Sequence, residues 1–189
     1  MERIADYKGG LLNHLETLYR PGDRELAIEL VEALGLTVVD TGFVNETGST
    51  YLAAHPNDDD QDRTNNVILL SEMLPSQAEI EAKIRSLIAA DAALTAAFDS
   101  YAEKARSDPF GTPHFGLRYP SEEALTPVID RLRNRLSPAL SARVSVNELP
   151  PLEEKVEGFP DIKQVFVYTD VFGVGGAAYG QLLELQVER

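Results

Sequence analysis

The chain lacks several features, and each absence excludes a class of protein. Its 189 residues include no cysteine, which excludes disulfides, thiolate nucleophiles and Cys-ligated zinc and leaves the redox compartment undetermined. No apolar stretch is as long as a membrane span, and the first residues, MERIADYKGG, lack the apolar core of a signal peptide. We therefore expect a cytoplasmic protein without a membrane partner.

Basic residues are few. The chain has 17 Lys and Arg against 31 Asp and Glu, for a formal net charge of −14. Such a surface repels phosphate backbones, so we expect no nucleic-acid partner. The acidic run NDDDQD at 57–62 is interpreted as a solvated loop tip, because the spaced ligands and central glycine of a calcium loop are missing.

Histidine is scarce too, and two of the three histidines stand in similar surroundings. LNHLETLYRPGDRELAIELVEAL contains His14 and Tyr19, and TPHFGLRYPSEEALTPVIDRL contains His114 and Tyr119. In both stretches a His opens a short alternating run, a Tyr follows five positions later, and a polar turn leads into a helical pattern. The similarity indicates an internal repeat.

The first repeat is predicted to be a β-α-β-β-β unit. GLLNHLETLY alternates as a strand does, and PGDRELAIELVEALG has the apolar spacing of a helix that ends at Gly35. Three strand candidates follow, separated by Gly, Asn and Asp clusters typical of turns. These candidates are LTVVDTG, STYLAAH and NNVILLSEM.

The second repeat is predicted to have the same order. PHFGLRY is its first strand, and SEEALTPVIDRLRNRL is a helix with Ser121 as N-cap. Its remaining strands are ARVSVNEL, KQVFVYTDVFG and QLLELQVER. The Ala-rich segment between the repeats has no strand signal and is predicted to form one or two helices. A helical linker is the simpler interpretation of that segment, and a lid over a pocket is the alternative.

These patterns predict one compact α+β domain built from two βαβββ modules. The first module covers residues 10–75, the inserted helical linker 76–110 and the second module 111–189. One such unit cannot bury both faces of a curved four-stranded sheet, whereas two together can. We therefore expect curved mixed sheets around a central cavity.

Paired β-α-β-β-β modules with a His in each first strand and LLELQ near the end resemble the vicinal oxygen chelate superfamily. That superfamily includes glyoxalase I, extradiol dioxygenases, methylmalonyl-CoA epimerase and metal-free resistance proteins that bind antibiotics such as bleomycin. The resemblance runs from about Leu11 to the C-terminus and implies that His14, His114 and Glu184 are metal ligands. Family members hold a metal from up to four strand positions.

The fourth position falls in NNVILLSEM, where Leu69, or Ile68 if the register slips, replaces the carboxylate of a glyoxalase-like member. Glu72 lies three residues beyond Leu69, and an odd offset in a strand points to the opposite face. Two His and one carboxylate is the arrangement that the family's extradiol dioxygenases use for Fe(II). The resemblance thus implies a 2-His-1-Glu metalloenzyme, most like an extradiol-type dioxygenase, acting on a small catechol-like substrate.

Strand alternation is consistent with this ligand set. His14 is predicted to share a face with Glu16 and Leu18, and His114 with Gly116 and Arg118. The opposite rows are apolar enough to meet the helices. A carboxylate at Glu184, inside LLELQ, would be costly to bury without a partner such as a metal or Arg118.

Other features leave alternatives open. Tyr168 is the candidate catalytic residue, but sixteen residues separate it from Glu184, more than the roughly ten of ring-cleaving enzymes. Tyr179 is another candidate, and His55 is interpreted as a loop histidine. Fe(II) is the favoured cofactor, with Mn, Zn or Ni also compatible. The same fold could instead be a metal-free small-molecule binding protein, or a glyoxalase-like isomerase or lyase, and the modules could pair within one chain or across a homodimer.

Overall fold

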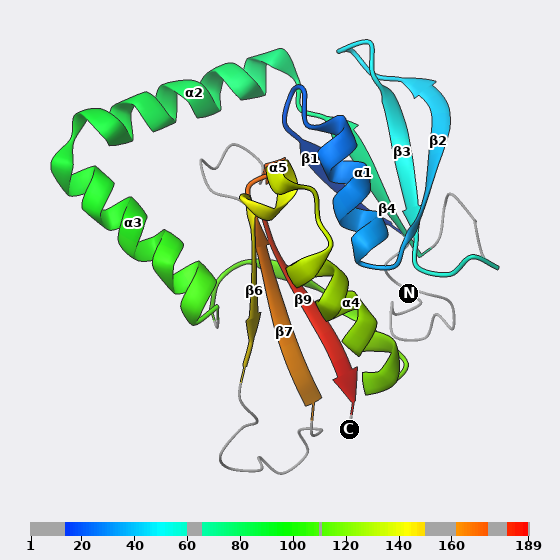
Figure 1. The fold of residues 1–189 in the computed structure, drawn as a ribbon. Coiled ribbons are helices and arrows are strands. Elements are labelled where there is room, and N and C mark those ends of the chain that lie inside the picture. Colours follow the sequence, from blue (N-terminus) through cyan, green and yellow to red (C-terminus); the bar gives the residue numbers. More distant parts are fainter. Residues whose placement is uncertain (1–13, 60–65, 110, 150–161, 174–180, 189) are drawn as a thin grey trace, which may run out of the picture.

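The computed structural model describes residues 14–59, 66–109, 111–149, 162–173 and 181–188 (Figure 1). In the last of these ranges only the side chain of Leu183 is described. Across these ranges the protein is of mixed α+β type, with five helices and two sheets. None of those helices is long and apolar enough to cross a lipid bilayer.

The first sheet has the strand order β2-β3-β4-β1-β8. Strands β1 and β4 run parallel, β3 is antiparallel to both β2 and β4, and β8 pairs antiparallel with the end of β1. Helix α1 connects β1 to β2. The bounds are β1 His14–Tyr19, α1 Arg24–Ala33, β2 Thr37–Val44, β3 Thr50–His55, β4 Val67–Glu72 and β8 Phe172–Gly173.

The second sheet has the order β5-β9-β7-β6. Here β5 and β9 run parallel, and β7 is antiparallel to both β6 and β9. Helices α4 and α5 connect β5 to β6. The bounds are β5 His114–Arg118, α4 Glu122–Asn134, α5 Pro138–Ser141, β6 Val144–Glu148, β7 Ile162–Thr169 and β9 Gln181–Glu188.

The ends of α1 and α4 follow from local sequence. Gly35, the residue after the C-cap Leu34 of α1, has φ +89° and donates its N–H to the Glu32 carbonyl, so a left-handed residue terminates the helix as predicted. At the start of α4 the Ser121 hydroxyl accepts a hydrogen bond from the Ala124 N–H at 3.3 Å. The predicted N-cap is therefore confirmed.

Helices α1 and α4 contact each other and cover one face of their respective sheets (Figure 1). A single hydrophobic core forms where the two helices and the two sheet faces meet. Its fully buried members include Tyr19, Leu30, Leu70, Leu125 and Leu183.

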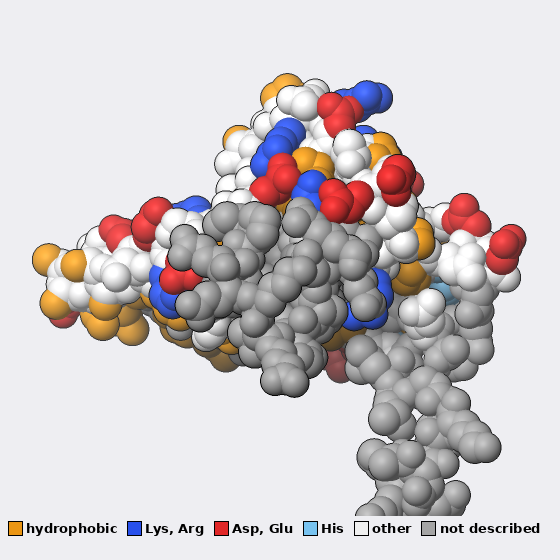
Figure 2. Space-filling view, turned by 90° about the horizontal axis from the view of Figure 1, so that it is seen from below, with side chains coloured by type: hydrophobic (Ala, Val, Ile, Leu, Met, Phe, Trp, Pro, Cys, Tyr) orange, Lys and Arg blue, Asp and Glu red, His pale blue; other side chains and the backbone are white. Residues whose placement is uncertain are grey.

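The segment between the sheets is two helices, α2 Pro75–Ala90 and α3 Ala92–Ser107. They form an arm that projects from the body, with the Asp91 carboxylate capping α3 at their junction (Figure 1). Figure 2 shows hydrophobic side chains along this arm, and Ile80, Leu87 and Leu94 are exposed. The end of α3 packs against β6 and β7, where Ala102 and Ala105 are buried.

One predicted strand was wrong in extent. KQVFVYTDVFG was expected to be continuous, but β7 ends at Thr169 and the chain turns before β8. Arg20 Nε donates to the Asp170 carbonyl at 2.8 Å, and Arg143 Nε donates to the Asp170 carboxylate at 2.6 Å. These bonds hold the turn after β7, where the chain leaves the second sheet and continues as β8 in the first sheet.

Candidate functional site

His14 is the first residue of β1, on the face that α1 does not cover. It is exposed, as is Glu16, whereas Thr17 and Tyr19 on the helix side are buried. His14 lines a cavity of about 360 Å³ together with Phe115, Gly116 and Leu117 of β5. The first strands of the two sheets therefore approach each other at this cavity.

His114 is the first residue of β5, again on the face away from the helix. It is exposed, while Phe115 and Leu117 point toward the core. Its Nδ1 lies 2.8 Å from the Thr112 carbonyl oxygen, and because a carbonyl only accepts, Nδ1 of a neutral ring carries the proton. Nε2 then has the lone pair, which is the tautomer a metal-binding histidine needs.

Glu184 lies in β9, and its side chain is outside the described residues. Its backbone pairs with Gly116 of β5 on one side and with Phe166 of β7 on the other. Gly116 is two residues beyond His114 and lines the cavity that His14 also lines. His114 and Glu184 are therefore backbone neighbours of Gly116, and His14 lines the same cavity as Gly116, which has no side chain of its own.

The position expected to hold a fourth ligand is occupied by Leu69, which is half-buried and pairs with Glu16 across the sheet. Glu72 is directed elsewhere, since its carboxylate accepts hydrogen bonds from Thr47 and Ser49 of the β2–β3 hairpin. Glu16 is the carboxylate nearest in sequence to His14 on the same face, and it accepts a hydrogen bond from Ser71 at 2.7 Å.

Within the ranges that the structure describes, no three His, Asp or Glu side chains are grouped closely enough to hold a metal. The predicted set His14, His114 and Glu184 includes one side chain outside those ranges, so the set stays a prediction. His114 is not among the described residues lining the cavity that His14 lines.

Tyr168 lies in the same cross-strand row as His114. The row runs from Ser145 in β6 through Tyr168 in β7 and Leu182 in β9 to His114 in β5. The neighbouring row contains Phe166, whose ring meets that of His114 edge-on at a centroid distance of 5.3 Å. The face of the second sheet opposite α4 therefore carries aromatic rings beside His114, and Phe166 on it is buried.

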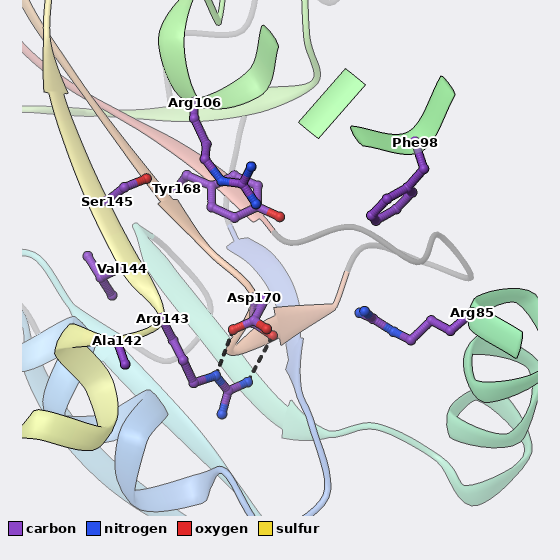
Figure 3. A pocket seen from close by; sticks show the side chains of 9 residues that line it. All are labelled: Arg85, Phe98, Arg106, Ala142, Arg143, Val144, Ser145, Tyr168 and Asp170. Atoms are coloured by element: carbon purple, nitrogen blue, oxygen red, sulfur yellow. Dashed lines mark hydrogen bonds and ion pairs between the residues drawn. The ribbon is translucent and has the colours of Figure 1, made fainter. Parts of the chain in front are cut away.

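The end of α3 covers part of this face and encloses a cavity of about 240 Å³ (Figure 3). The central carbon of the Arg106 guanidinium lies 4.9 Å from the centroid of the Tyr168 ring. We call this space the arginine cavity, because three arginines line it. Its lining residues are Arg85, Phe98, Arg106, Ala142, Arg143, Val144, Ser145, Tyr168 and Asp170.

Arg143 is held in place by two carboxylates. Its Nη2 lies 2.8 Å from Asp23, and its Nε donates to Asp170 at 2.6 Å. The hydrogen bond with Asp23, and then that with Asp170, raises the pKa of Arg143 above its ordinary value despite partial burial. Arg143 therefore stays charged and joins α1, β6 and the β7–β8 turn.

His55 differs from its sequence interpretation. It is the last residue of β3, paired with Thr37, and its side chain is 1% exposed rather than part of an open loop. Within the described residues its Nδ1 is buried without a hydrogen-bond partner. Tyr179 lies outside the described residues.

Sequence reasoning missed Arg85, Phe98 and Arg106 as lining residues, because helical periodicity in α2 and α3 does not say where the arm packs. No local signal in the sequence identifies these three residues as lining a cavity. No family model matches the chain, and a search of curated proteins finds no match. The assignment of function therefore depends on the residues themselves.

Proposed function

We propose that the protein is a metal-dependent enzyme of the vicinal oxygen chelate type, most like an extradiol dioxygenase. In this proposal the two sheets and their helices are repeated βαβββ modules, and His14, His114 and Glu184 hold one divalent ion, preferably Fe(II). The substrate would be a small molecule with two adjacent oxygens, such as a catechol.

The observation that carries the proposal is the position of the three candidate ligands relative to Gly116. His114 lies two residues away along β5, Glu184 is the register partner of Gly116 in β9, and His14 lines the same cavity. Neighbouring strands are about 4.8 Å apart and alternate residues of one strand about 6.6 Å apart. These spacings put the backbone positions of His114 and Glu184 close together, and the proposal adds His14 because it lines the same cavity as Gly116.

The donor chemistry fits a first-row metal. Two imidazoles and one carboxylate leave coordination positions open, which is the pattern of non-haem Fe(II) oxygenases. The hydrogen bond between His114 and the Thr112 carbonyl fixes the ring orientation, as the outer partner of a metal-binding His does. When bound, such an ion would supply positive charge that favours ionisation of a substrate hydroxyl.

The chain's own residues would position the substrate. Phe166 and Tyr168 form the wall beside His114, and Leu69 replaces the second carboxylate of a glyoxalase-like site. A Leu at that position would supply no further ligand, so an ion held by the other three residues would keep coordination positions open. We therefore favour the dioxygenase type over the isomerase or lyase type.

Metal content is the first test. Protein purified without chelator, or reconstituted anaerobically with Fe(II), should bind about one equivalent, with ligand distances of about 2.0–2.2 Å. His14→Ala, His114→Ala and Glu184→Gln should each lose the metal, whereas Glu188→Gln, four residues along the same strand, should retain it. Retention of metal by both His variants would contradict the assignment.

Oxygen uptake is the second test, using the Fe(II)-loaded protein and a panel of catechols. We expect uptake that depends on His114. Uptake that survives His114→Ala would refute the mechanism.

A metal-free binding protein is the second candidate, because the arginine cavity on the same face has two aromatic walls, Phe98 and Tyr168. Tight binding of one ligand by metal-stripped protein, without turnover of any catechol, would favour this candidate.

A further inference from the structure

The arginine cavity gathers positive charge in a strongly acidic protein. Of the described residues, those that line it supply three guanidinium groups and one carboxylate, although the chain carries a net charge of −14. Ionic screening limits charge effects to about 8–10 Å, so a ligand in the cavity experiences mainly the groups that line it. The local field there favours an anion even though the surface as a whole repels one.

Two of these arginines have no carboxylate partner among the residues that the structure describes. Several other arginines do pair with a carboxylate, namely Arg20, Arg24, Arg133, Arg135 and Arg143. Within the described chain, neither Arg85 nor Arg106 forms an ion pair, and both are exposed where they line the cavity. Among the described residues Asp170 is the one lining carboxylate, and it is bound by Arg143, so the charges of Arg85 and Arg106 can serve a ligand.

The two guanidinium groups come from different helices and face one space. Figure 3 shows Arg85 extending from α2 toward the middle of the cavity, and Arg106 descending from α3 onto Tyr168. Stacking on Tyr168 orients Arg106 and leaves the N–H groups at the edge of its plane available. A planar guanidinium presents paired N–H donors that match the two oxygens of a carboxylate.

The walls and the size define the rest of the ligand. Phe98 and Tyr168 stand on different sides of the cavity in Figure 3, and both present aromatic surface. A space of about 240 Å³ is below the 300–1,000 Å³ typical of drug-sized ligands. We propose that the arginine cavity binds a small aromatic carboxylate, with its carboxylate between Arg85 and Arg106 and its ring against Phe98.

The proposal does not depend on the metal site. Its test is therefore an NMR titration of the full-length, metal-stripped protein with benzoate, compared with benzamide and acetate. Benzamide has the ring without the charge, and acetate the charge without the ring. Because a hydrogen bond to a charged group contributes about 1.5–3 kcal/mol, benzoate should bind about tenfold or more tightly than either.

Variants locate the site. Arg85→Gln and Arg106→Gln should each weaken benzoate binding about tenfold or more. Arg135→Gln removes an equally exposed charge that is paired with Asp130 on α4, and it should leave the affinity unchanged. Phe98→Leu should weaken benzoate binding and leave that of acetate unaltered. Melting curves of all variants confirm folding.

Three outcomes would overturn the proposal. The first is benzoate binding no tighter than that of benzamide or acetate at millimolar concentrations. The second is binding that survives both Arg85→Gln and Arg106→Gln. The third is binding that appears only when metal is added, because the ligand would then belong to the metal site. Failure of metal binding in the earlier tests, by contrast, would leave this result unchanged.

Discussion

The guanidinium of Arg106 lies over the ring of Tyr168, 4.9 Å from its centroid, and so connects the end of α3 to the face of the second sheet opposite α4. Nearby, Asn147 of β6 donates hydrogen bonds from its side-chain amide to the carbonyls of Arg106 and Ser107. The helical arm is thus attached to the sheet at its C-terminal end. Arg106 reaches the cavity because its backbone is held there.

We expect Arg106 and Tyr168 to be energetically coupled. A cation over an aromatic ring contributes about 0.5–1 kcal/mol at an exposed site. A double-mutant cycle with Arg106→Gln and Tyr168→Leu, measured by urea denaturation, should show a coupling of that size. Tyr168→Phe keeps the ring and should retain the coupling, so its loss in that variant would mean that the hydroxyl, and not the ring face, is responsible.

The base of the arm contains a buried ion pair between Arg20 and Glu81, whose side chains are 17% and 2% exposed. Arg20→Met would leave the Glu81 charge buried without its partner and should destabilise the fold by about 3 kcal/mol. Adding Glu81→Met should recover much of that loss, because an apolar pair replaces an ionic one at little cost. Chemical denaturation of the single and double variants measures both effects.

The matched control lies on the same helix. Lys83 pairs with Glu79, and both side chains are mostly exposed, at 72% and 66%. Lys83→Met should therefore leave the unfolding free energy unchanged within error. A loss equal to that of Arg20→Met would show that helix propensity or surface charge, and not burial, explains the result.

Much of the fold was predictable because its local signals are strong. Strand alternation at 114–118 and the apolar spacing of 24–33 identified β5 and α1, and Gly35 and Ser121 marked helix ends. Such features depend on residues within one or two turns of each other. The exposed side of His14 and His114 also follows from alternation.

The features that the sequence did not predict depend on contacts between residues distant in the chain. The YTDVFG stretch has the composition of a strand throughout, and only Arg20 and Arg143, distant in sequence, hold its turn. Likewise, the sequence indicates a loop histidine at His55, but His55 ends strand β3 and its side chain is buried. Docking of α3 beside Tyr168 has no local signal at all. Tertiary packing, and not local sequence, determines the turn, the burial of His55 and the docking of α3.

Gly173 in β8 is required by a close approach. A Cβ added there would collide with the Met73 methyl group and lie 3.1 Å from Glu81 Oε1. Gly173→Ala should therefore destabilise the fold by about 1–3 kcal/mol through overpacking. Met73→Ala makes room, so the double variant should lose less than the sum of the two single losses in denaturation experiments. Strict additivity would show that Met73 simply moves aside.

Tyr119, after β5, donates a hydrogen bond to the Leu34 carbonyl at 2.8 Å, and burial raises its pKa despite the nearby Arg131. In the unfolded chain the phenol ionises near pH 10. Above that pH the unfolded state has lost a proton that the folded state keeps, so stability falls as pH rises further. Below it, both states are neutral and this contribution does not change.

Tyr119→Phe isolates this effect. At neutral pH the variant should be less stable by about 1 kcal/mol, because the Leu34 carbonyl loses its donor. As pH rises above 10, wild type should lose up to about 1.4 kcal/mol per pH unit relative to the variant, since only wild type has the phenol. Urea denaturation of both proteins between about pH 8 and 11 measures the difference. A difference that stays constant across that range would mean that Tyr119 ionises equally in both states, and hence that the Leu34 contact does not exclude its charged form.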